Sequence, residues 1–274
     1  MRYIKLSFKY LIKNILFVFL LSLIPAIFMG SLLSPFKFLE FINNYANLVV
    51  MGFGDIFYSI IDISWLKLLF YVIGFGLLGI CVSIIIGFIE NHFRSGKRNY
   101  FNIKNYINNN ILAVVLNLII ITITNFIVSF LCGTIIYLFH IMIAGLNSAP
   151  NAGLVVLAII MFTVYLCVMA VVSMVLFLNI PSMNLNGYTF KQSLSGTINF
   201  ISNNFINLLL AVFVPILITI PLISIFNFSN VALHIVNCIC IIISIMYYTS
   251  FVMTAYFVLN NIMRYDNRKY YSIK

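Results

Sequence analysis

The residues of this chain that could carry chemistry are few, and the first set consists of histidines and cysteines. His140 and His234 each lie near one end of a long apolar run, and Cys238 and Cys240 closely follow His234. Imidazole and thiolate are zinc ligands, and paired histidines within a membrane can relay protons. Cys238 and Cys240, however, fall on different faces of a helix, and no acidic residue lies deep in an apolar run. We therefore predict no metal, no cofactor and no catalytic residue.

Two further patterns resemble sites. Residues 74–79 have the sequence GFGLLG, which matches the dinucleotide pattern G-x-G-x-x-G. That pattern carries meaning only between a strand and a helix, and here it lies inside an apolar run. Glu40, Asp55 and Asp62 lie in segment 34–65, which we interpret as interfacial helices, with Pro35 as a first helical residue and Trp65 as an anchor. We interpret the three carboxylates as a solvated rim and not as a catalytic pair.

Amide and hydroxyl side chains within the apolar runs form the last set: Asn117, Thr122, Thr124, Asn125 and Thr219. They could line a polar pathway, or they could make hydrogen bonds between helices. The second use is the commoner one in lipid, and we favour it.

Composition sets the environment in which all of these residues lie. The 274 residues are 64% hydrophobic and 7% charged, whereas soluble domains have roughly 45–50% apolar and about 25% charged residues. The chain is therefore an integral membrane protein. Its net charge of +10 does not indicate nucleic acid, because the basic residues flank apolar runs. The five cysteines all lie in those runs, where they act as small hydrophobic residues.

Six apolar runs are long enough to cross a bilayer, which needs about 20 residues per helix. They cover residues 15–33, 66–89, 111–140, 153–178, 205–225 and 231–259. The first is too long for the core of a signal peptide, so we expect it to be retained as a span. The third continues apolar to residue 146, so it must tilt, break near Gly133 or project beyond the lipid, and we predict projection with tilt.

Lysine and arginine predict the orientation, because positively charged loops stay in the cytoplasm. Only Lys37 and Lys67 lie on one side of the six runs. The other side has thirteen basic residues: Arg2, Lys5, Lys9, Lys13, Arg94, Lys97, Arg98, Lys104, Lys191, Arg264, Arg268, Lys269 and Lys274. Both termini are therefore expected in the cytoplasm. Frequent Ile, Asn, Lys, Phe and Tyr, which AT-rich codons favour, suggest a bacterial cytoplasmic membrane.

A repeated design is visible before the odd-numbered runs, where a basic or polar stretch ends in asparagine. Asn14, Asn110 and Asn204 occupy this position, and proline follows eleven residues after the first and the third, at Pro25 and Pro215. The alternative is chance similarity in an asparagine-rich chain. The predicted fold is all-α, with six transmembrane helices as three hairpins (about 1–96, 97–186 and 187–274) in a single domain of residues 1–274. A cytoplasmic amphipathic helix precedes each odd span, and the lysines of the first would lie on anionic lipid.

Small residues and prolines predict how the spans pack. One face of the second span presents Gly76, Gly79, Ser83 and Gly87, at spacings that let another helix approach closely. Helix kinks are expected at Pro25, Pro215 and Pro221.

Residues 186–205, NGYTFKQSLSGTINFISNNF, carry a resemblance. Lys191, Ser193 and Asn204 match a pattern of a basic residue, a serine two positions on, and an asparagine before the span; Gly96 and Lys97 match a second. In these features the chain resembles bacterial multi-pass proteins of the YciC-like group, which includes the membrane domain of some glycerophosphodiester phosphodiesterases. The resemblance implies the six-span fold. It implies no hydrolysis, because no phosphodiesterase barrel is attached.

Three functional hypotheses follow. The first is a non-enzymatic multi-pass protein that acts as a transporter-like or accessory subunit with a protein partner. The second is a lipid-binding or lipid-handling domain, in which anionic headgroups would bind at Arg94, Lys97, Arg98 and Lys104. The third, an immunity or regulatory protein, has the same sequence features as the first.

Overall fold

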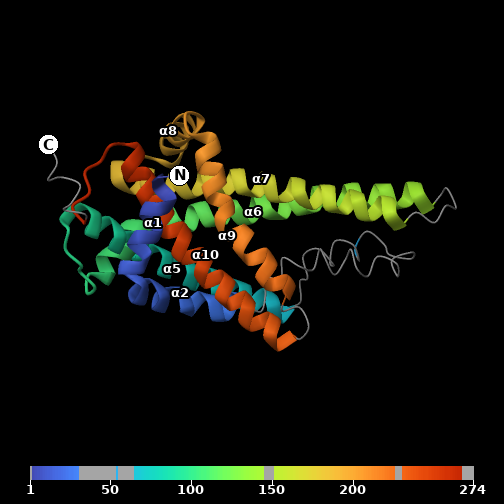
Figure 1. Cartoon of the computed structure of the whole chain (residues 1–274), viewed down its shortest axis with the longest axis horizontal. Helices are drawn as coiled ribbons and strands as arrows, with labels where there is room; N and C mark the ends of the chain where they lie inside the picture. Colours follow the sequence, from blue (N-terminus) through green and yellow to red (C-terminus); the bar gives the residue numbers. More distant parts are fainter. Residues whose placement is uncertain (1, 31–53, 55–64, 145–150, 226–229, 267–274) are drawn as a thin grey trace.

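The described part of the chain is helical. The computed structural model describes residues 2–30, 54, 65–144, 151–225 and 230–266 (Figure 1). Within these ranges the long elements are helices and no strand is present. They are α1 (Arg2–Lys13), α2 (Ile15–Met29), α5 (Trp65–Ser95), α6 (Ile103–Ala144), α7 (Asn151–Asn186), α8 (Phe190–Ser202), α9 (Phe205–Ile225) and α10 (Asn230–Leu259).

Five of these helices, α5, α6, α7, α9 and α10, are long and apolar enough to cross a membrane. The helix α2 has 15 residues, so it rises about 22 Å and falls short by itself. It joins α1 at a bend of 92°, and the two count as a sixth span only when taken together. The predicted first run, 15–33, continues past Met29 into residues outside those described, as does segment 34–65 with its three carboxylates.

The helix α5 is the most buried of the five candidate spans. It packs against α2 and α6, while α10 packs against α1, α2 and α9. Phe88, Phe93 and Phe257 fill the core beside them and are fully buried. Of the most apolar stretch of α5, 61% is buried within the protein, compared with 22% for α6 and 17% for α7. The surface of α6 and α7 is therefore left for lipid or for another protein.

The helices α6 and α7 form one long hairpin that extends beyond the other described helices (Figure 1). Their 42 and 36 residues rise about 63 and 54 Å, roughly twice the hydrocarbon thickness. The helix α6 runs without a break through Gly133. The break considered there does not occur, because nothing in the sequence around Gly133 removes a backbone hydrogen bond.

Separate helices lie before two of the three odd runs, and their amphipathic role at the membrane stays a prediction. The helix α1 ends at Lys13, directly before Asn14, and α8 ends at Ser202, before Asn203 and Asn204. The prediction for the third is wrong, since Asn110 lies inside the continuous helix α6. Asn110 donates to the Tyr106 carbonyl four residues earlier, so its amide is satisfied without interrupting the helix.

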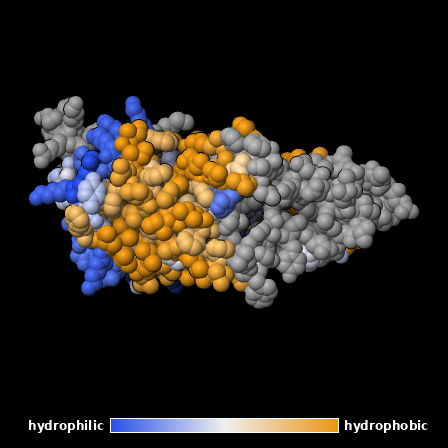
Figure 2. All heavy atoms as spheres, turned by 90° about the horizontal axis from the view of Figure 1, so that it is seen from below, coloured by the Kyte–Doolittle hydropathy of each residue, from blue (hydrophilic) through white to orange (hydrophobic). Residues whose placement is uncertain are grey.

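Polar and apolar surfaces separate along the long axis. Figure 2 shows hydrophilic residues gathered at one end and a broad apolar surface beside them. The polar end is the one where α1 and the end of α5 lie in Figure 1. It also carries the candidate functional site.

Candidate functional site

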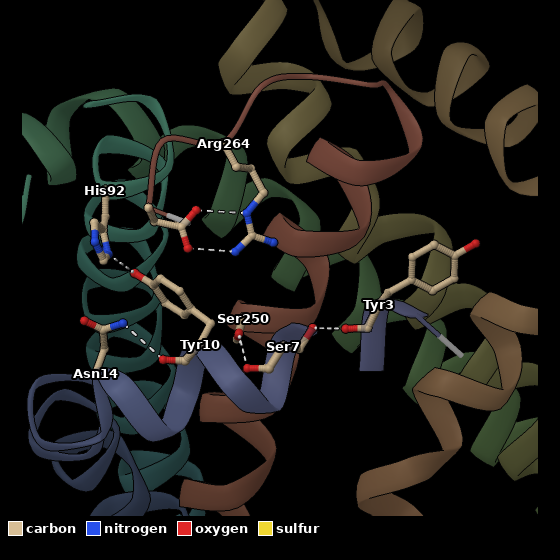
Figure 3. Close-up of polar contacts among 8 residues, drawn as sticks. Tyr3, Ser7, Tyr10, Asn14, His92, Ser250 and Arg264 are labelled. Atoms are coloured by element: carbon tan, nitrogen blue, oxygen red, sulfur yellow. Dashed lines mark hydrogen bonds and ion pairs between the residues drawn. The ribbon is translucent and has the colours of Figure 1, made fainter. Parts of the chain in front are cut away.

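Three parts of the chain that are distant in sequence meet at the polar end of the bundle: α1, the last turn of α5, and α10 together with residues 260–266 that follow it. We call this meeting point the polar junction (Figure 3). Its central side chains are Ser7, Tyr10, His92, Ser250 and Arg264, and all five are buried.

The buried face of α1 supplies most of the polar junction. Tyr10 Oη lies 3.1 Å from His92 Nδ1, which joins α1 to α5. Ser250 Oγ of α10 donates to the Ser7 carbonyl at 3.1 Å, and Asn14 Nδ2 donates to the Tyr10 carbonyl at 3.1 Å (Figure 3). These positions recur at spacings of three and four, so one face of α1 points inward. Hydrogen bonds thus fix α1 across the bundle.

Residues 260–266 return from α10 to the end of α5. Asn261 has φ of 53°, a left-handed conformation that asparagine tolerates, and it turns the chain. Tyr265 N then donates to the Phe93 carbonyl at 2.8 Å, and the Arg264 guanidinium lies 3.7 Å from the centre of the Phe93 ring. Two hydrogen bonds of 3.1 and 3.0 Å join Arg264 to Asp266. We call residues 260–266 the C-terminal clasp.

The hydrogen bonds of the polar junction either join two segments or stabilise one segment locally. Ser7 Oγ donates to the Tyr3 carbonyl at 2.8 Å, and Ser250 Oγ donates to the Ser7 carbonyl, so neither hydroxyl is paired with a base. Tyr10 and His92 can share a proton between phenol and imidazole. The polar junction therefore holds helices together. The basic residues near it are exposed.

The four basic residues proposed for lipid headgroups are exposed, but they are not equivalent. Arg94 forms an ion pair with Glu90 at 3.2 Å, one turn earlier on α5. Arg98 Nη2 donates to the Lys13 carbonyl at 3.3 Å, which brings α1 against the loop that follows α5. Lys97 and Lys104 are exposed on either side of that contact in sequence. Lys13, absent from the proposed set, is thus adjacent to it.

The small residues predicted to lie on one face of α5 differ in whether they contact α6. A Cβ at Gly87 would lie 2.7–2.8 Å from Tyr106 of α6, and one at Gly79 would lie 3.1 Å from Val115. Ser83 is buried and donates to the Gly79 carbonyl. Gly76 has nothing within 4 Å of that position, so it lies outside the contact.

The three prolines lie inside helices. The helix α2 continues through Pro25, and α9 continues through both Pro215 and Pro221. The kinks expected at them stay a prediction.

Amide side chains join α6 to α7 along much of the hairpin. Asn184 donates to Asn110, Asn179 Nδ2 donates to Asn117 Oδ1 at 3.1 Å, and Tyr165 donates to Asn125. Ser193 of α8 extends the central bond by donating to Asn179 Oδ1 at 2.6 Å. This bond gives the serine of the motif around residue 193 a structural role, because it anchors α8 to α7.

The remaining polar residues within the spans divide between two uses. Tyr71 Oη lies 3.2 Å from Thr122 Oγ1, a contact between α5 and α6. Thr124 and Thr219 bond to carbonyls of their own helices. No polar pathway is needed to account for them.

The histidine and cysteine set forms no metal site among the described residues, where no group of three potential ligands is found. His234 Nε2 lies 3.9 Å from Cys238 Sγ on the same helix, and Cys240 is buried. The His140 side chain falls outside what the structure describes, so its pairing with His234 stays untested.

Sequence reasoning missed the polar junction. His92 and Tyr10 are 82 positions apart, and nothing in either local sequence indicates the other. One signal was present, since Tyr3, Ser7, Tyr10 and Asn14 recur at helical spacing on the side of α1 away from its lysines. We compared the chain with protein-family models, curated proteins and solved structures, and none of them matches it.

Proposed function

We propose that this chain is a non-enzymatic, six-span protein of a bacterial cytoplasmic membrane that acts as a transporter-like or accessory subunit, with both termini in the cytoplasm. Five apolar helices and the shorter α2 supply the spans. The cytoplasmic side is assigned from the basic residues, which cluster at the end carrying the polar junction.

The observation that carries the accessory role is the extent of exposed apolar surface on the α6–α7 hairpin. Leu112 is 73% exposed and Met142 is 65% exposed, and exposed apolar residues recur between them. The two positions are separated by about 45 Å of helix, whereas hydrocarbon covers about 30 Å. Tilt accommodates part of this excess. A partner protein that packs on the hairpin would cover the rest.

A photoreactive residue in α6 tests this role in the membranes of the source organism. Ile135 is 44% exposed, whereas its neighbour Ile136 is 1% exposed, so the two positions form a matched pair. We expect a photoreactive side chain at position 135 to crosslink to one discrete polypeptide, and one at 136 to link only within the chain.

Lipid adducts alone at position 135 would contradict the accessory role. Hydrolase or transferase activity of the purified chain would contradict the non-enzymatic assignment. A crosslinked polypeptide that is a toxin or a signalling protein, encoded beside this chain, would instead support the immunity or regulatory hypothesis.

A further inference from the structure

The exposed side of α1 has two different surfaces. Lys5, Lys9 and Lys13 are exposed at spacings of four, so they form one stripe along the helix. Phe8, 39% exposed, and Ile12, 71% exposed, form a second stripe between the lysines and the buried face. A helix with neighbouring basic and apolar stripes is suited to the interface between lipid headgroups and acyl chains.

The bend after α1 orients these two stripes relative to the membrane. Because α1 and α2 meet at 92°, α1 lies along the membrane surface when α2 enters the membrane. The apolar stripe continues around the bend, where Ile15 is 54% exposed and Leu16 is 72% exposed. Figure 1 shows α1 lying across the long helices at the polar end. The lysines therefore lie at headgroup level.

The loop between α5 and α6 adds a second basic and apolar segment beside this bend. Phe101 is 94% exposed and lies between Arg98 and Lys104 in sequence. The loop is held against α2 and α5 because the Tyr100 ring stacks on Phe88 at 5.2 Å and contacts Phe17 at 5.1 Å.

The hydrogen bond from Arg98 to the Lys13 carbonyl joins the end of α1 and the loop between α5 and α6 into one surface. We infer that Lys13, Lys97, Arg98 and Lys104 bind the phosphates of anionic phospholipids in the cytoplasmic leaflet, while Ile12 and Phe101 insert beneath the headgroups. This anionic-lipid surface replaces Arg94 of the original set with Lys13, because Glu90 already neutralises Arg94. It does not depend on the accessory role.

The chemistry favours a lipid over a free anion. Four exposed cations flanked by exposed apolar side chains match a charged headgroup with attached acyl chains, and each basic residue near an anionic surface adds to the attraction. A small anion would leave Ile12 and Phe101 in contact with water.

Native mass spectrometry of the full-length protein in detergent provides the test. Phosphatidylglycerol or phosphatidylcholine with identical acyl chains is titrated, and the bound lipid is counted. We expect preferential retention of phosphatidylglycerol, and about a tenfold weaker affinity for it in the double variant Lys13→Gln/Arg98→Gln. The matched control, Arg94→Gln/Lys191→Gln, removes the same charge elsewhere and should change affinity less than about twofold.

Equal loss of lipid in the two double variants, or no loss in the first, would overturn the inference. A monodisperse elution profile for both variants shows that each is folded. Competition with a large excess of inorganic phosphate distinguishes a lipid surface from a site for free phosphate. A lipid surface should keep its bound phosphatidylglycerol, whereas a site for free phosphate should release it.

A fluorescent probe tests the insertion of Phe101 independently. The chain has one tryptophan, so Trp65→Phe combined with Phe101→Trp creates a single probe in the loop. In phosphatidylglycerol bilayers brominated near the headgroup, we expect strong quenching of its emission. Unquenched, water-like emission would show that the loop does not enter the lipid.

Discussion

At the scale of single residues, the structure distinguishes positions that have the same residue type. Gly87 and Gly76 lie on one helix, yet only Gly87 is in contact with α6. The sequence predicted the face that they share, but it could not predict where along that face α6 would cross. That depends on the tilt of α6 and on the bulk of Tyr106, which meets Gly87 directly.

Gly87→Ala should lower the free energy of unfolding by about 1–3 kcal/mol, because the new methyl group would lie within 2.8 Å of the buried Tyr106 ring. Gly76→Ala is the control, since nothing lies within 4 Å there. Thermal unfolding in detergent measures both. Equal midpoints for the two variants would show that α5 and α6 do not pack closely at Gly87.

Asn179→Ala should destabilise the protein by about 1–2 kcal/mol, because Asn117 Oδ1 loses its donor and Ser193 Oγ keeps only the longer bond to the carbonyl of residue 179. Thr124→Val is the matched control, because Thr124 bonds only to the Ile120 carbonyl of its own helix. Chemical unfolding in mixed micelles would compare the two. An equal loss of stability in the Thr124 variant would show that the Asn179 amide has no special role.

At the scale of elements, hydropathy predicted where the long helices lie, but it predicted their ends in some helices and not in others. The helix α9, Phe205–Ile225, has the bounds of its predicted run, because asparagines precede it and a change of composition follows. The helix α6 begins at Ile103, before its predicted run, although asparagine is a weak helix former, because Tyr106 packs against Gly87 of α5 and Asn110 bonds to Asn184 of α7. Long-range contacts such as Tyr10 with His92 have no local signal.

The C-terminal clasp supplies a prediction at this scale. Asp266→Ala removes both bonds to the Arg264 guanidinium, whose side chain is 10% exposed, and should cost about 1–3 kcal/mol. The released clasp should become sensitive to trypsin at Arg264 under native conditions. Lys191→Ala, at an exposed residue of α8, is the control. Cleavage rates that match those of the wild-type protein would argue that the clasp is held by its backbone contacts alone.

At the scale of the whole molecule, orientation is the property that the sequence predicts most directly, through its thirteen basic residues on one side. Figure 2 shows hydrophilic residues gathered at one end of the molecule, beside a broad apolar surface. The apolar run that continues to residue 146 predicted that the third span would exceed the hydrocarbon thickness, but hydropathy alone does not say how the excess divides between tilt and projection.

Reporter fusions check this orientation. We expect green fluorescent protein to fluoresce when fused after Lys274, and alkaline phosphatase to be active when fused after Ser148, because the hairpin tip then lies outside the cytoplasm. The reciprocal fusions are the controls and should be inactive. Active phosphatase at the C-terminus would reverse the orientation and move the anionic-lipid surface to the outer leaflet.

The bond between Ser250 and Ser7 spans 243 positions, and this has a consequence for biosynthesis. The helix α1 therefore finds its partner only when α10 has been made, roughly 12–50 s later at 5–20 residues per second. Until then the inward face of α1 has no α10 to pack against. A chain that stops before α10 would present this unsatisfied face to membrane proteases, so the contact forms only in chains that contain α10.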